Sequence, residues 1–143
     1  MVQVGLLEDN ARIAKLCATM LQYAGHHVTV YEHPRECLDA LLTEVVGRHV
    51  VSSRSVMTRQ SATLPIDVLI LDLHLPDITG IDVLHSLRAD PRTRSLPLIF
   101  CTAATPTEVA SALTIAPQGR FIEKPFTYQE LVAAIDSVLH STH

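Results

Sequence analysis

The sequence predicts an α/β protein built on a doubly wound parallel sheet. Short apolar segments alternate with longer segments in which apolar residues recur at helical spacing, and the alternation occurs five times. The third apolar segment, residues 66–71, is almost entirely apolar, which is typical of a central parallel strand with helices on both faces. We therefore expect five strands flanked by five helices in one domain, residues 1–143.

The first two strand–helix units have clear boundaries. Residues 2–7 form the first predicted strand, Asn10 is suited to cap the following helix, and Gly25 is suited to end it. A second strand is predicted at residues 28–31. Apolar residues at helical spacing over residues 34–45 then predict the second helix.

The segment from Gly47 to Pro65 interrupts this alternation. It has no clear period, is rich in Ser, Thr and Arg, and contains no acidic residue. A loop of this length is uncommon in a compact domain, so it is either a surface insertion or contains a small hairpin within residues 49–58. Because it connects a helix to a strand, we expect it at the amino edge of the sheet, and we expect deletion of its middle to leave the fold intact.

The second half of the chain continues the pattern. Asp90 and Pro91 are suited to end the third helix, because a residue before proline disfavours helical geometry. The expected elements, in order, are a strand at 66–71, a helix at 81–89, a strand at 96–103, a helix at 107–116, a strand at 119–124 and a helix marked by Leu131, Ile135 and Val138.

Composition excludes several classes of protein. The net charge of −4 and the absence of an evident basic patch argue against direct binding to nucleic acid or to a membrane surface. No apolar stretch is long enough to span a bilayer, and acid follows a short apolar run at the N-terminus, unlike a signal peptide. Three well separated cysteines predict free thiols in a cytoplasmic protein.

Charged or hydroxyl side chains follow four of the five predicted strands. Glu8 and Asp9 follow the first strand, Asp72 the third, Thr102 ends the fourth, and Lys124 ends the fifth. In a doubly wound sheet the carboxyl ends of the strands share one edge, and ligands bind there. Each residue alone is a weak signal, but together they predict one site.

This set of side chains suits phosphoryl transfer. Three carboxylates in one crevice repel one another, and a divalent cation with oxygen ligands, Mg²⁺ above all, would remove that penalty. Lys124 and Thr102 would neutralise and bind phosphoryl oxygens. Asp72, which is central and followed by a tight loop, is the natural nucleophile, giving an aspartyl phosphate. No glycine-rich loop follows the first strand, so neither a P-loop nor a dinucleotide fingerprint is present.

The chain resembles the receiver domains of the bacterial response-regulator family, which share the chemotaxis-regulator-like fold of two-component signalling. The resemblance rests on the order and spacing of four motifs: LLEDN, LILDLHLPDITG, LIFCTA and FIEKPF. It implies a flavodoxin-like sheet with strand order 2-1-3-4-5 and an insertion of about residues 47–65 between the second helix and third strand. It also implies a cis bond before Pro125.

The resemblance also implies a role for each matching residue. Asp72 would accept a phosphoryl group from a histidine kinase or phosphotransfer protein. Asp9 would bind Mg²⁺ directly, Glu8 through water, and the backbone carbonyl of His74 would be a further ligand. The protein would then be a phosphorylated signalling module of a two-component system rather than an enzyme, catalysing only its own phosphoryl uptake and loss.

A second set of roles concerns the output. Thr102 and Lys124 would bind the phosphoryl oxygens, and Phe121 occupies the position of the switch aromatic. Phosphorylation would remodel the surface of helix 4, strand 5 and helix 5 and strengthen binding to a downstream protein or self-association. Residues 103–122 carry only Glu108 and Arg120 as charged side chains, which suits a contact surface but also an ordinary small helix.

Two positions differ from the common family pattern. Glu8 replaces the more usual aspartate and lengthens that side chain by one methylene. His74 and Ala104 lie where family members tune hydrolysis of the acyl phosphate; His74 is either an ordinary surface histidine or a residue that shapes dephosphorylation.

Two alternative functions stay open at this point. A haloacid-dehalogenase-type phosphatase also combines an aspartate nucleophile with Mg²⁺, but it needs an acid two residues after the nucleophile, where this chain has His74. A pseudo-receiver would bind partners without phosphorylation, and it is disfavoured because every acidic, Thr and Lys position is filled. The chain is either a stand-alone receiver or part of a longer regulator.

Overall fold

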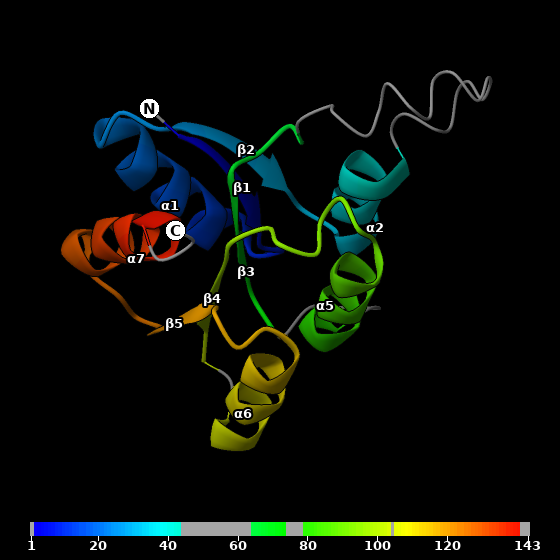
Figure 1. Cartoon of the computed structure of the whole chain (residues 1–143). Helices are drawn as coiled ribbons and strands as arrows, with labels where there is room; N and C mark the ends of the chain where they lie inside the picture. Colours follow the sequence, from blue (N-terminus) through cyan, green and yellow to red (C-terminus); the bar gives the residue numbers. More distant parts are fainter. Residues whose placement is uncertain (1, 44–63, 74–78, 104, 141–143) are drawn as a thin grey trace.

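A computed structural model of the chain describes residues 2–43, 64–73, 79–103 and 105–140. Figure 1 shows a sheet at the centre with helices packed on both of its faces. The strands pair in parallel in the order β2-β1-β3-β4-β5, which confirms the predicted doubly wound topology. They are β1 Gln3–Leu7, β2 His27–Tyr31, β3 Val68–Leu71, β4 Leu98–Thr102 and β5 Arg120–Glu123.

The helices divide between the two faces of the sheet. Helices α1 (Ala11–Tyr23) and α7 (Tyr128–His140) cover one face. Helices α2 (Pro34–Leu38), α5 (Gly80–Ala89) and α6 (Pro106–Ile115) cover the other (Figure 1). All five correspond to helices that the sequence predicts.

The second helix differs from its prediction in one respect. The apolar spacing predicts one continuous helix over residues 34–45, whereas α2 is followed by a π-helical turn at Asp39–Thr43. The guanidinium of Arg92, in the α5–β4 connection, donates to the carbonyl oxygens of Leu41 (3.3 Å) and Leu42 (2.5 Å). This side chain binds carbonyl groups at the end of the turn, and the apolar pattern alone carries no signal for it.

Alternation along the central strands builds two hydrophobic layers. In β4, Leu98 and Phe100 face α2, α5 and α6, whereas Ile99 and Cys101 face α1 and α7. The same period of two occurs in β3, where every residue is buried. Burial on both faces explains why these strands are continuous apolar runs in the sequence.

Helix caps fix the chain just beyond the strand ends. The Asn10 carboxamide oxygen accepts from the backbone N–H groups of Arg12 and Ile13, which confirms its predicted capping role. Gly25 has a φ of 94°, a left-handed conformation that favours glycine, and it follows α1 as expected. The Asn10 cap thus begins α1 at Ala11, shortly after β1 ends at Leu7.

The remaining predictions about organisation have mixed outcomes. Cys17, Cys37 and Cys101 are buried and free, as predicted. Most of the segment from Gly47 to Pro65 lies outside the described residues, so the surface-insertion and hairpin alternatives stay predictions. Among the described helices, none combines the length and apolar character that crossing a membrane requires.

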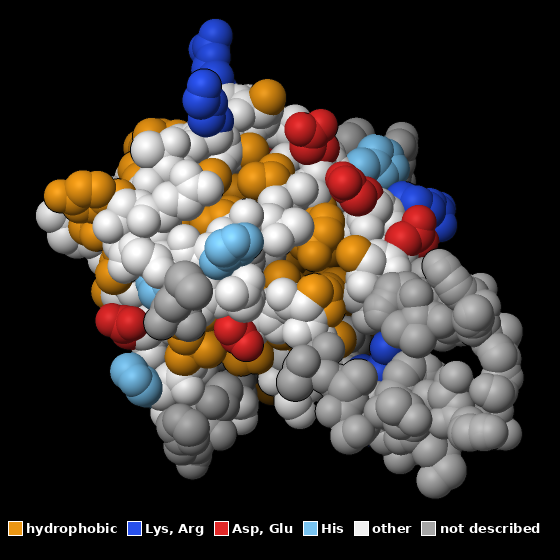
Figure 2. Space-filling model, turned by 90° about the horizontal axis from the view of Figure 1, so that it is seen from above, with side chains coloured by type: hydrophobic (Ala, Val, Ile, Leu, Met, Phe, Trp, Pro, Cys, Tyr) orange, Lys and Arg blue, Asp and Glu red, His pale blue; other side chains and the backbone are white. Residues whose placement is uncertain are grey.

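Figure 2 shows one face of the molecule, viewed from above relative to Figure 1. On the described part of this face, Lys and Arg side chains (blue) are few and lie near the margins, while apolar side chains (orange) reach the surface near the middle. The described part of this face therefore shows no continuous basic patch of the kind that binds nucleic acid.

Candidate functional site

Three acidic side chains meet at the carboxyl edge of the sheet. Glu8 and Asp9 directly follow β1, and Asp72 directly follows β3, its neighbour in the sheet. One carboxylate oxygen from each of the three lies within 4.8 Å of the others. Glu8 and Asp72 are buried, whereas Asp9 is exposed. The structure thus brings together the acids that the sequence predicts to share one site.

The sheet's hydrogen-bond ladder positions these residues. Each of Glu8, Asp72 and Lys124 uses its backbone N–H to bond a carbonyl of the neighbouring strand, just past the last paired residues. The three bonds are Glu8 to Tyr31, Asp72 to Leu7 and Lys124 to Thr102, each 3.2 Å long. Because the backbone at each strand end is tied to the next strand, the charged side chains start from fixed points.

Lys124 connects two of the acids across the crevice. Its ammonium Nζ donates to Glu8 Oε1 at 2.8 Å and to Asp72 Oδ2 at 3.0 Å. The exposed fractions of the Lys124, Glu8 and Asp72 side chains are 16%, 4% and 8%. The contacts are therefore largely shielded from water, where charge-assisted hydrogen bonds are strong.

Among the described residues, the carboxylates of the crevice outnumber its positive charges. Burial raises the pKa of Glu8, although the hydrogen bond from Lys124 and one from the Asn10 N–H oppose this. Burial alone would lower the pKa of Lys124, but its hydrogen bonds to Glu8 and Asp72 outweigh burial and raise it. With all groups ionised, three carboxylates against one ammonium leave a net charge of −2. A divalent cation would balance this charge.

Gly80 lets helix α5 approach the strand end that carries Asp72. A Cβ atom at this position would lie 2.5 Å from the Leu73 Cα and 2.7 Å from the Asp72 carbonyl oxygen. Both obstacles are backbone atoms, which cannot swing aside as a side chain can. The final glycine of the motif at residues 69–80 is therefore required by close packing directly behind Asp72.

Thr102 and Phe121 lie on the two strands nearest the end of the sheet. Thr102 is fully buried at the last position of β4, and its backbone carbonyl accepts from Lys124. Phe121 is paired with Phe100 and leaves 36% of its surface exposed. Thr102 thus lies beside the crevice, and Phe121 lies on the adjacent strand with its ring partly outside the core.

Two other predicted features have different outcomes. The peptide bond between Lys124 and Pro125 is cis, as the resemblance implies. His74, whose backbone carbonyl is predicted to bind Mg²⁺, and Ala104 lie outside the described residues.

A family model described as the response regulator receiver domain matches residues 4–136. The chain belongs to this family. The receiver domain match begins within β1, spans the other four described strands and most of α7, and it identifies the chain as a receiver domain of two-component systems. This match gives no support to the phosphatase or pseudo-receiver alternatives.

Similar proteins agree with this assignment. Response regulator SaeR of Staphylococcus aureus strain USA300 is 24% identical over 140 residues, covering 97% of this chain and 51% of SaeR. The receiver domain thus spans about half the length of the curated relatives that it matches.

Solved structures share the fold. A putative response regulator from Chloroflexus aurantiacus J-10-fl has a TM-score of 0.74 at 22% identity, covering 97% of this chain and 98% of that one. Chemotaxis protein CheY4 of Vibrio cholerae has a TM-score of 0.71 at 22% identity, covering 96% and 98%. The receiver domain of sensor histidine kinase PA1611 from Pseudomonas aeruginosa PAO1, solved with a magnesium ion in its active site cleft, has a TM-score of 0.71 at 21% identity, covering 97% and 98%.

Sequence reasoning missed some of the residues that support the site. The Asn10 backbone N–H donates to Glu8 Oε2 at 3.1 Å, a contact to the second oxygen of a carboxylate that Lys124 also binds. Thr105 and Glu108 form a capping box that starts α6 just beyond Thr102. The signal for this box was in the sequence, as a threonine followed three residues later by glutamate.

Proposed function

We propose that Asp72 of this receiver domain accepts a phosphoryl group. One observation carries the proposal: the Asp72 carboxylate lies 3.0 Å from the Lys124 ammonium and within 4.8 Å of carboxylate oxygens of Glu8 and Asp9. A nucleophile, a fixed cation and a cluster of hard oxygen ligands therefore share one crevice at the carboxyl edge.

The chemistry requires little of the protein beyond positioning. A carboxylate oxygen of Asp72 would attack the phosphorus of a phosphohistidine, forming an O–P bond as the N–P bond breaks. The electron pair of the broken bond stays on the imidazole nitrogen of the donor, which takes up a proton. Lys124 would stabilise the negative charge of the transferred group, and the Thr102 hydroxyl would donate to one of its oxygens.

The acidic side chains fit Mg²⁺. Hard oxygen ligands in a crevice of net negative charge are what this ion selects, and the spacing of the three carboxylates suits a shared ion. Asp9 and Asp72 would bind directly, Glu8 through water, and the backbone carbonyl of His74 would add a ligand. When bound, the ion would neutralise the carboxylates and the incoming phosphoryl oxygens.

The partners follow from the same proposal. A histidine kinase or phosphotransfer protein would supply the phosphoryl group in the cytoplasm, a compartment that suits the three free cysteines. Phosphorylation would draw Thr102 toward the new oxygens and let Phe121 turn inward. The surface of α6, β5 and α7 would then change and bind a downstream protein or a second copy of the domain.

The decisive experiment compares two aspartates. Incubation with acetyl phosphate and Mg²⁺ should add one base-labile phosphoryl group to the wild-type protein, detected by intact mass. Asp72→Asn should abolish this adduct, and Asp136→Asn, which changes an exposed aspartate on α7, should leave it unchanged. Undiminished labelling of Asp72→Asn would show that another residue is the acceptor.

Metal removal tests the second part of the proposal. Chelation with EDTA should stop phosphoryl uptake, and added Mg²⁺ should restore it. Asp9→Ala should weaken Mg²⁺ binding by roughly tenfold or more, because the crevice loses one of its direct ligands. If Asp9→Ala binds Mg²⁺ as tightly as the wild type in calorimetry, the ion does not bind at this cluster.

A third experiment addresses the output surface. Thr102→Ala should still take up a phosphoryl group on Asp72 but should lose the gain in self-association or partner binding that phosphorylation brings. Sedimentation of the phosphorylated and unphosphorylated forms measures this gain. Equal association of the two wild-type forms would exclude the switch.

A further inference from the structure

A second cleft lies at the amino edge of the sheet, away from Asp72. Its volume is about 420 Å³, which falls within the range of small-molecule sites. Its lining includes Leu98, the first residue of β4, and Gly119, which immediately precedes β5. Because all strands are parallel, these residues place the cleft at the edge opposite the acidic crevice.

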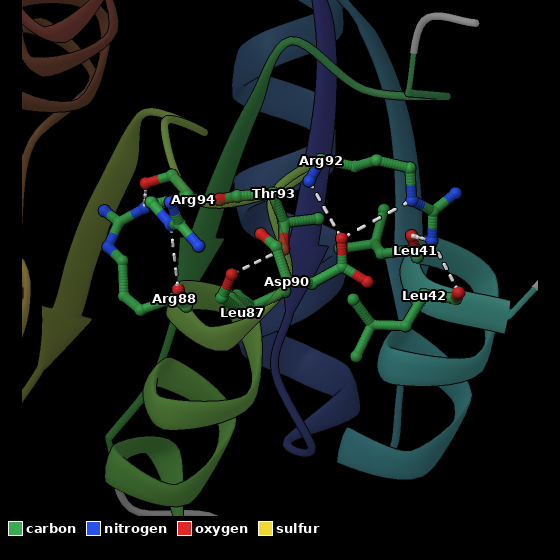
Figure 3. Close-up of polar contacts among 8 residues, drawn as sticks. All are labelled: Leu41, Leu42, Leu87, Arg88, Asp90, Arg92, Thr93 and Arg94. Atoms are coloured by element: carbon green, nitrogen blue, oxygen red, sulfur yellow. Dashed lines mark hydrogen bonds and ion pairs between the residues drawn. The ribbon is translucent and has the colours of Figure 1, made fainter. Parts of the chain in front are cut away.

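Two arginines on one wall of this cleft hold each other in place. Arg88 Nη1 donates to the backbone carbonyls of Thr93 (3.2 Å) and Arg94, while Arg94 Nε donates back to the carbonyl of Arg88 at 3.4 Å. Figure 3 shows the two guanidinium groups side by side where α5 ends. The reciprocal bonds therefore hold two like charges close together.

No acidic side chain in the described part of the chain forms an ion pair with Arg88 or Arg94. Arg92, two residues before Arg94, does form an ion pair, because its Nε lies 3.5 Å from Asp90 Oδ1. Burial lowers the pKa of Arg88, so its charged form has lost part of its hydration without gaining a carboxylate. Each guanidinium retains N–H groups beyond those used in the bonds above, and these are available to an acceptor.

Among the other residues that line the cleft, those with apolar side chains outnumber the polar ones. Leu96, Pro97, Ile115, Pro117 and Val138 contribute to its lining, together with the polar residues Ser95 and Gln118. A ligand that matches both walls must carry a compact anion and an apolar group. Two guanidinium groups match the charge of a phosphate dianion, whose oxygens can accept paired N–H donors from arginine.

We propose that this cleft binds a small organic phosphate monoester, with its phosphate on Arg88 and Arg94 and its organic group against the apolar wall. Inorganic phosphate would satisfy the arginines but leave the apolar wall in water. A carboxylate would match only one of the two positive charges. The monoester is thus the simplest ligand that uses both walls, and it would bind independently of phosphorylation at Asp72.

Titration of the full chain with phenyl phosphate, followed by NMR without Mg²⁺, tests the proposal. Backbone amides at 94–96 and 118–119 should shift and saturate, and inorganic phosphate and phenol should each bind more weakly than phenyl phosphate. Arg94→Gln should weaken phenyl phosphate by roughly tenfold or more, because a charge-assisted pair is lost. Arg35→Gln, which alters an exposed arginine on α2, is the matched control and should bind normally.

Two further variants keep the outcome decisive. Arg88→Lys retains the charge but loses the fork of N–H donors, and it should also weaken binding, with folding checked by the unchanged amide spectrum elsewhere. Asp72→Asn should bind phenyl phosphate as the wild type does. A loss of binding at the Arg88–Arg94 cleft can therefore be told apart from a loss of phosphorylation at Asp72. Shifts that do not saturate, an affinity unchanged in Arg94→Gln, or shifts centred on residues 8–9 and 124 would each overturn the proposal.

Discussion

At the carboxyl edge of the sheet Lys124 faces two buried carboxylates, whereas at the amino edge Arg88 and Arg92 donate to backbone carbonyls. The two settings shift the pKa of the cations in opposite directions: contacts with Glu8 and Asp72 raise that of Lys124, and burial lowers that of Arg88. Among the described residues, three carboxylates against one ammonium leave the crevice at the carboxyl edge negative, whereas Arg88 and Arg94 leave the cleft at the amino edge positive.

This difference shows how one sheet can offer two kinds of site. The carboxyl ends of parallel strands carry side chains that reach into a shared crevice, and here those side chains are acids. At the amino edge, Arg92 and Arg94 of the α5–β4 connection donate to carbonyls in the last turns of two helical segments, where backbone acceptors lack helical partners. The first arrangement suits a cation and the second suits an anion.

The largest effect should come from removing Lys124, the one ammonium that the described residues bring to the carboxyl crevice. Lys124→Gln leaves Glu8 and Asp72 buried without their ammonium, and we expect a loss of about 3 kcal/mol in the free energy of unfolding without Mg²⁺. Added Mg²⁺ should recover part of this loss. Urea denaturation measures both values, and a loss equal to that of Arg88→Gln would contradict the proposed contrast between the edges.

The next largest effect should come from a single methyl group. Gly80→Ala places a Cβ against the backbone of Asp72 and Leu73, and we expect a cost of about 2 kcal/mol together with slower phosphoryl uptake. Gly119→Ala, at the amino edge, meets mainly the side-chain ring of Phe100 at 2.7 Å. It should cost less stability and leave phosphoryl uptake unchanged, which a side-by-side labelling assay would establish.

A smaller effect is expected from the arginine that binds the π-helical turn. Arg92→Gln loses bonds to Leu41 and Leu42 and its contact with Asp90, all partly open to solvent, so we expect a cost of about 1 kcal/mol. Labelling of Asp72 should continue at the wild-type rate. A strong loss of labelling would mean that this connection communicates with the crevice.

The smallest effect should appear in the pH dependence. Because the folded-state pKa of Lys124 lies above its usual 10.5, its contribution to stability is complete below pH 10.5 and is lost as pH rises through the folded value. In Mg²⁺-free buffer the wild type should therefore lose more unfolding free energy above pH 10.5 than Lys124→Gln does. If the unfolding free energies of the two proteins fall in parallel as the pH rises, the carboxylates do not raise the pKa of Lys124.

Much of the fold could be predicted because helices and buried strands differ in the spacing of their apolar residues along the sequence. Residues 66–71 are apolar at every position but Asp67 because β3 is covered on both faces, and the strand order follows from the family resemblance. Glu8, Asp9, Asp72 and Lys124 could be grouped because parallel strands end at one edge. Their meeting within one crevice confirms that inference, while their chemical roles remain proposals.

The features that were missed depend on the backbone groups that long polar side chains reach. Nothing local in residues 39–43 indicates that Arg92, some fifty positions further on, bonds to their carbonyls. The reciprocal bonds of Arg88 and Arg94 are likewise invisible as a pattern, because arginine near a helix end is ordinary in any sequence. Periodicity reports which residues are buried, and it says little about where long polar side chains reach.

Backbone bonds tie Glu8, Asp72 and Lys124 to their neighbouring strands. The number of residues in each strand therefore determines where these side chains lie in the crevice. One residue added to β3 would advance its end by about 3.3 Å and turn the following side chain to the opposite face of the sheet. The insertion before Ile66 leaves the distance from Val68 to Asp72 untouched. Length can therefore vary at the amino side of a strand, whereas a residue gained or lost between the first paired residue and the carboxyl end would displace the side chains of the site.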